Sequence, residues 1–132
     1  MQGASVRLVR LALLSSISST SYENFVLYML QFIGPVRVLT TPRFGRWLTG
    51  LRDRRARSAI LARIDRMADG YPGDWRTLDS TLAELRIHLG PGYRLYFSRQ
   101  GNNTVILLNA GTKASQSSDI SMAKRLAEAL RS

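Results

Sequence analysis

The sequence predicts one α+β domain made of a short N-terminal strand, two helices, an antiparallel three-stranded meander and a C-terminal helix. Two observations support this fold class. The hydrophobic patterns fit a short strand and two helices, followed by three strands and a last amphipathic helix. The 132 residues, of which 45% are hydrophobic, suffice for one core and hardly for two.

The first half of the organised region is predicted to form a strand and two helices. The strand covers 36–40, after which Thr41 and Pro42 offer an N-cap and a first-turn proline. The second helix covers about 53–69 and ends at Gly70. Apolar residues at i, i+3, i+4 and i+7 give the first helix one buried face, and the second helix is also expected to bury an apolar face. The expected buried residues are Phe44, Trp47, Leu48, Leu51, Ala56, Ile60, Ile64 and Met67.

The second half is predicted to form the meander and the last helix. The three strands fit about 82–89, 93–99 and 104–110. The third is apolar at consecutive positions, so we expect it to be central and covered on both faces. Trp75 lies in the preceding loop and is expected to be exposed. The last helix runs from about Ser118 and is expected to bury Ile120, Ala123, Ala127 and Leu130.

The register of the hairpin around 90–92 follows from polarity, since a slip of one residue moves every side chain to the other face. A three-residue loop is favoured over a two-residue Pro-Gly loop because it pairs apolar residues with each other. Those pairs are Leu89 with Tyr93, Ile87 with Leu95 and Leu85 with Phe97. The other face then places His88 opposite Arg94 and Arg86 opposite Tyr96.

The composition indicates a polyanionic partner and excludes several kinds of site. The chain carries 19 Lys and Arg against 9 Asp and Glu, a net charge of +10, and all but two of the cations are arginine. Arginine's planar fork suits phosphate and carboxylate, so RNA, DNA and an acidic protein all remain open. The absence of cysteine and the single histidine exclude disulfides, thiolate zinc sites, cysteine nucleophiles and multi-histidine metal sites. Neither a metal nor a cofactor is expected.

The N-terminal segment 1–28 differs from the rest of the chain. Two arginines followed by leucines suggest a signal peptide, but Ser15 and Ser16 interrupt the apolar run and no small-x-small cleavage site follows. We therefore expect 1–28 to be a misassigned start, with Met29 as the initiator, or a disordered tail. Residues 29–132 then form the functional domain.

Over about 36–130 the sequence resembles a known family. The matching pieces are Phe44-x-x-Trp47-Leu48-x-x-Leu51-Arg52-Asp53, Glu84-Leu85-Arg86-Ile87-His88-x-Gly90-Pro91-Gly92-Tyr93-Arg94-x-Tyr96-Phe97 and Gly111-x-Lys113-x-x-Gln116-x-x-Asp119-Ile120. They are similar to the HigB-like addiction module killer proteins of type II toxin–antitoxin systems, a branch of the RelE/ParE toxin superfamily. Ala110-Gly111 stands where that family commonly has two glycines.

The resemblance implies a small RelE-like fold and a cytoplasmic toxin. It implies a ribosome-dependent endoribonuclease, or mRNA interferase, which cleaves mRNA and so inhibits translation. The expected partners are a cognate helix-turn-helix antitoxin, the ribosome and mRNA, with no membrane and no small-molecule ligand. Two alternatives remain open, namely a ParE-like DNA gyrase poison and a non-catalytic module that serves in an antitoxin and operator complex.

Four residues are candidates for catalysis. Metal-free RNA cleavage needs removal of the 2′-hydroxyl proton, stabilisation of a charged phosphorane and protonation of the leaving oxygen. Arg86 and Arg94 suit the phosphorane, His88 suits proton transfer, and Lys113 can supply charge or an acid. Alternatively, His88 is only a hydrogen-bonded surface residue.

Three further residues are candidates for RNA binding. Tyr96 can stack on a base, while Arg55 on the second helix and Arg99 at the end of the second meander strand can contact phosphates. Alternatively, such arginines bind nothing and only form a solvated charged face. A structural ion pair of Arg86 with Glu84 or Asp79 also remains open.

Overall fold

The computed structural model describes residues 31–32 and 34–131. The expectation about 1–28 and Met29 therefore lies outside the described residues. The strands are β1 (Gln31–Phe32), β2 (Arg37–Thr40), β3 (Trp75–Thr77), β4 (Ala83–Ile87), β5 (Tyr93–Gln100) and β6 (Thr104–Thr112). The helices are α2 (Pro42–Thr49), α3 (Arg54–Ala68) and α4 (Gln116–Arg131), with a 3₁₀ turn η3 (Lys113–Ser115) before α4.

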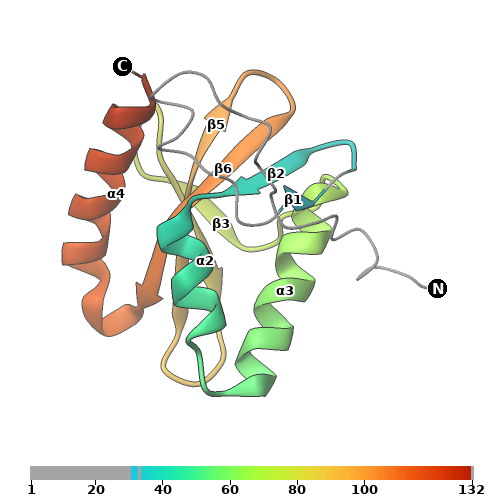
Figure 1. The fold of residues 1–132 in the computed structure, drawn as a ribbon, viewed down its shortest axis with the longest axis vertical. Helices are drawn as coiled ribbons and strands as arrows, with labels where there is room; N and C mark the ends of the chain where they lie inside the picture. The colour runs from blue at the N-terminus through green and yellow to red at the C-terminus, as the bar shows by residue number, and fades with distance from the viewer. Residues whose placement is uncertain (1–30, 33, 132) are drawn as a thin grey trace.

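The described strands form one sheet in the order β1-β2-β6-β5-β4-β3. Strand β2 runs parallel to β6, and every other neighbouring pair is antiparallel. Helices α2 and α3 share a core with one face of the sheet, while α4 packs on the other face (Figure 1). The predicted α+β class is confirmed, and so is the central position of β6, whose middle is buried on both faces.

Local signals in the sequence account for the helix boundaries. The Thr41 hydroxyl accepts a hydrogen bond from the Phe44 N–H at 3.1 Å and caps α2. The Asp53 carboxylate caps α3 in the same way, by accepting from the N–H groups of Arg55 and the next residue. Gly70 adopts a left-handed φ of 95° after the end of α3, as expected of a C′ glycine. The predicted apolar stripes of both helices are buried or partly buried in the core.

The predicted register of the β4–β5 hairpin is wrong by two residues. Ile87 pairs with Tyr93, so the loop contains the five residues His88–Gly92 where we expected three. Gly90 and Gly92 both take left-handed conformations, with φ of 54° and 83°. They belong to a turn that includes His88 and Leu89, so these two residues do not pair with β5. Because side chains alternate with a period of two, the shift leaves each residue on its predicted face.

Two strands were not predicted. Strand β1 is one, and the other is β3, which occupies the sheet edge where a loop was expected. Trp75 at the start of β3 is half-buried rather than exposed, with its ring 6.1 Å from that of Phe97. A three-residue strand is too short to show an alternating pattern, and β3 owes its order to pairing with β4. Helix α4 also begins at Gln116, slightly before the expected Ser118.

Candidate functional site at the β4–β5 turn

Two arginines lie side by side on the α4 face of the sheet. Arg86 on β4 is the cross-strand partner of Arg94 on β5. Arg94 is only 9% exposed, and its Nε–H has no hydrogen-bond partner among the residues that the structure describes. A buried guanidinium with an unsatisfied donor is unfavourable unless an acceptor completes it, and an anion also neutralises its charge. The pair is therefore a candidate anion site.

Asp74 joins Arg86 to His88. One carboxylate oxygen of Asp74 accepts from Arg86 Nη2 at 3.0 Å, and the other lies 2.6 Å from His88 Nε2. An ionised carboxylate can only accept, so Nε2 carries the proton and Nδ1 is left available. His88 itself has a side chain that is 69% exposed. The hydrogen bond from His88, followed by that from Arg86, holds the pKa of Asp74 below its ordinary value.

The sequence did not identify Asp74 as a site residue. An ion pair of Arg86 with Glu84 or Asp79 was considered instead, and that choice of partner is wrong. Glu84 is fully buried and accepts from Arg76 Nε at 2.9 Å and from Gln116 Nε2 at 2.6 Å. Asp79 caps its own turn by accepting from backbone N–H groups. Pairing of β3 with β4 brings Asp74 to Arg86, and no local sequence signal reveals this pairing.

Arg63 of α3 positions the segment that carries Asp74. Its guanidinium donates to the carbonyl oxygens of Pro72 at 2.8 Å, Arg86 at 2.8 Å and Asp74 at 3.3 Å. Gly73 lies directly against this guanidinium with a φ of 83°, so a side chain there would meet both a clash and a strained backbone. Burial lowers the pKa of Arg63 from its ordinary value. No pattern in the sequence singles out this arginine as a site residue.

Lys113 emerges at the same end of the sheet. Its backbone N–H donates to the carbonyl of Gly92 at 2.7 Å, which places it at the start of β5, and its side chain is exposed. Strand β6 neighbours β5, so the end of β6 brings Lys113 next to the turn before β5. The structure thus brings Arg86, His88, Arg94 and Lys113 to one end of the sheet.

The motif around Lys113 anchors the start of α4. Gly111 is the cross-strand partner of Arg94, and the Asp119 carboxylate lies directly over it. A Cβ at Gly111 would clash with that carboxylate and lie 2.7 Å from Ser115 Oγ. Glycine is therefore required here because the first turn of α4 packs on the backbone.

The other predicted residues do not join this group. Tyr96 is fully buried beneath α4, where burial and the nearby Glu84 raise its pKa, so its ring is not available to stack on RNA as we expected. Arg99 lies on the opposite face at the far end of β5, stacked on Trp75. The five-residue separation of Arg94 and Arg99 explains this, because odd separations in a strand point to opposite faces. Arg55 is exposed at the start of α3.

Fold and site together define a small basic α+β protein with an incompletely partnered arginine pair and an Asp–His pair at one end of its sheet. A family model described as "Phage derived protein Gp49-like (DUF891)" matches residues 46–130. An uncharacterized protein of Haemophilus influenzae is 42% identical over 95 residues, which are 72% of this chain and 96% of that protein. No solved structure matches the chain.

The chain belongs to the Gp49-like family, a family of toxin–antitoxin addiction module toxins related to RelE and HigB. Membership implies an antitoxin partner. None of the described helices is long and apolar enough to cross a membrane. Within the same residues, no cluster of three or more histidine, aspartate and glutamate side chains offers a metal site.

Proposed function

We propose that this protein is the toxin of a type II toxin–antitoxin module and acts as a metal-independent endoribonuclease on mRNA bound to the ribosome. The observation that carries the proposal is Arg94, a nearly buried cation with an unsatisfied donor beside Arg86 and the Asp74–His88 pair. A backbone phosphate supplies the missing acceptors, and arginine forks bind phosphate bidentately. A protein-binding surface alone would not need a proton-transfer group among phosphate-binding ones.

The chemistry follows from these positions. His88 takes the proton of the 2′-hydroxyl through its available Nδ1, while Asp74 holds the resulting imidazolium. The 2′ oxygen forms a bond to phosphorus, and the bond from phosphorus to the 5′ oxygen breaks. Arg86 and Arg94 stabilise the charge that develops on the phosphorane. Lys113 provides positive charge or a proton for the leaving 5′ oxygen.

The ribosome is part of the proposal because the site is open. With a single histidine in the chain, one imidazole cannot serve as acid and base at once. The exposed His88 also lacks surrounding walls that would align a flexible RNA. Alignment of the mRNA by the ribosome supplies the missing orientation. The purified protein should therefore cut free RNA poorly and mRNA on translating ribosomes efficiently.

The test is primer extension on mRNA after induction, combined with purified ribosome assays and a melting temperature for every variant. Arg94→Ala should slow cleavage by ~10²–10³ and His88→Ala by ~10²–10⁴. Lys113→Ala should weaken cleavage, and Lys113→Arg should restore part of it if only charge is needed. Arg55→Ala is the control, because it should change only the salt dependence of binding.

Gyrase supercoiling is measured in parallel with cleavage. Gyrase inhibition with intact mRNA would overturn the proposal in favour of a gyrase poison. Full toxicity of both His88→Ala and Lys113→Ala would likewise show that this face is not the active one. Binding to an antitoxin and operator without any toxicity would favour the non-catalytic module.

A further inference from the structure

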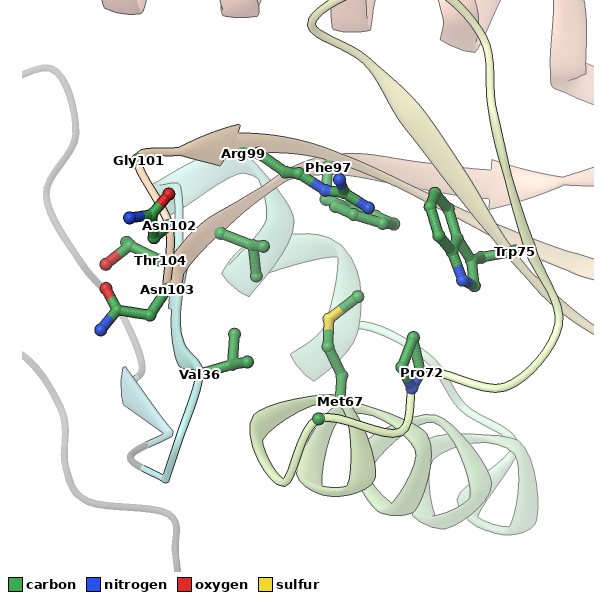
Figure 2. Close-up of a pocket in the computed structure, with 12 residues that line it drawn as sticks. Val36, Met67, Pro72, Trp75, Phe97, Arg99, Gly101, Asn102, Asn103 and Thr104 are labelled. Carbon is green, nitrogen blue, oxygen red and sulfur yellow. The ribbon is translucent and has the colours of Figure 1, made fainter.

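A hollow of about 530 Å³ lies on the α2 and α3 face of the sheet, at the opposite end of β5 from the candidate site. Its apolar wall is formed by Val36, Met67, Pro72, Trp75, Phe97 and Val105. Figure 2 shows Met67 reaching from the end of α3 toward Phe97, with Trp75 at one side. The hollow exists because α3 ends at Ala68, whereas β5 and β6 continue to the turn at Gly101. Apolar sheet surface there has no described helix over it.

The mouth of this hollow carries a cation. Arg99 is exposed, and its guanidinium lies 4.8 Å from the centre of the Trp75 ring. A guanidinium stacked in this way keeps its in-plane N–H donors free for a carboxylate. In the described part of the chain, no carboxylate forms an ion pair with Arg99. Asn102 and Asn103 border the same mouth and add amide donors and acceptors (Figure 2).

We propose that this hollow is the docking site of the antitoxin, entered by an apolar side chain of the antitoxin while an adjacent acidic residue binds Arg99. Protein interfaces commonly depend on an apolar side chain that fills a pocket and on an arginine next to it. The net charge of +10 attracts an acidic partner surface, and Arg99 provides a cation for it at the mouth of the hollow. The inference rests on the antitoxin partner that family membership implies, and it is independent of nuclease activity.

RNA suits this hollow less well. Surfaces that bind single-stranded RNA combine several cations with open aromatic faces. Here Arg99 already covers Trp75, and Phe97, whose ring lies 6.1 Å from that of Trp75, is only 2% exposed. A base that packed against the apolar wall, away from the asparagines at the mouth, would leave its polar edges without partners there. An apolar side chain would pack against the apolar wall, and a carboxylate next to it would form an ion pair with Arg99.

The test measures the Kd between the full chain and the product of the adjoining gene, used as the antitoxin, by isothermal titration calorimetry. Arg99→Glu reverses the charge at the mouth, and Asn102→Trp fills the mouth from an exposed position. Arg125→Glu makes the same charge change at an exposed position on α4, across the sheet, and is the matched control. Both mouth variants should weaken binding by about thirtyfold or more, and the control by less than about threefold.

A labelled oligouridine titrated under the same conditions separates the two kinds of partner. If Arg99→Glu weakens oligouridine binding and leaves antitoxin binding unchanged, the hollow serves RNA and the docking proposal is overturned. Equal losses for Arg99→Glu and Arg125→Glu also overturn it, because they indicate long-range attraction alone. Absence of any complex between the full chain and the antitoxin also overturns the docking proposal. Cleavage of mRNA is measured separately, so failure of either proposal is recognised without the other.

Discussion

Replacing Arg63 by alanine tests whether a partly buried hydrogen-bond network, rather than surface charge, holds the candidate site together. The guanidinium of Arg63 donates to the carbonyls of Pro72, Asp74 and Arg86, and so ties α3 to the loop before β3 and to the end of β4. Removing it leaves these carbonyls dependent on water. It also releases the segment whose carboxylate holds His88.

The size of the effect follows from the two hydrogen bonds of 2.8 Å, to Pro72 and Arg86. Hydrogen bonds from a charged group contribute about 1.5–3 kcal/mol each, and partial solvent exposure places these toward the lower end. We therefore expect Arg63→Ala to lower the free energy of unfolding by about 2–4 kcal/mol. For a domain of this size, that corresponds to a fall in Tm of about 10–20 °C.

Thermal melting followed by circular dichroism measures the change, and the ring signals of His88 in NMR spectra report on the site. Arg63→Lys should give an intermediate Tm, because an ammonium is a point donor and cannot span three carbonyls. Arg66→Ala, on an exposed neighbouring turn, is the matched control for the loss of one charge. If Arg63→Ala and Arg66→Ala melt at the same temperature, the network does not stabilise the fold and the reasoning fails.

Three other changes test separate parts of the structure. The pKa of Asp74 is below its ordinary value of 3.8, so the stability that Asp74 contributes is present above pH 3.8 and is lost as the pH falls through the lower folded pKa. The Tm of Asp74→Asn should therefore fall less than the Tm of the unaltered protein as the solution is acidified. Identical dependence of Tm on pH in the two proteins would contradict this. Gly111→Ala should destabilise by about 1–3 kcal/mol in urea unfolding, because its methyl group clashes with Asp119 and the start of α4 must shift. Tyr96→Phe should leave mRNA cleavage unchanged because the ring is fully buried, and a large loss of cleavage would restore a role for Tyr96 in RNA binding.

In the β4–β5 hairpin, the polarity pattern predicted the face of each side chain but not the register. Alternation placed Arg86 and Arg94 on one face and the apolar residues on the other, and the structure agrees. Polarity could not distinguish registers that differ by two residues, because both keep every side chain on the same face. The actual register depends on the five-residue turn and on pairing with β3 and β6.

The amino-acid sequence by itself determined what depends on neighbours along the chain. The caps at Thr41 and Asp53, the apolar stripes and the strand faces are local, since each is set by residues within a few positions of one another. Only the tertiary structure decided which distant groups meet: Asp74 beside His88, Arg63 of α3 on carbonyls of β4 and of the loop before β3, and Tyr96 beneath α4. These contacts depend on strand order and helix packing, which no local pattern encodes.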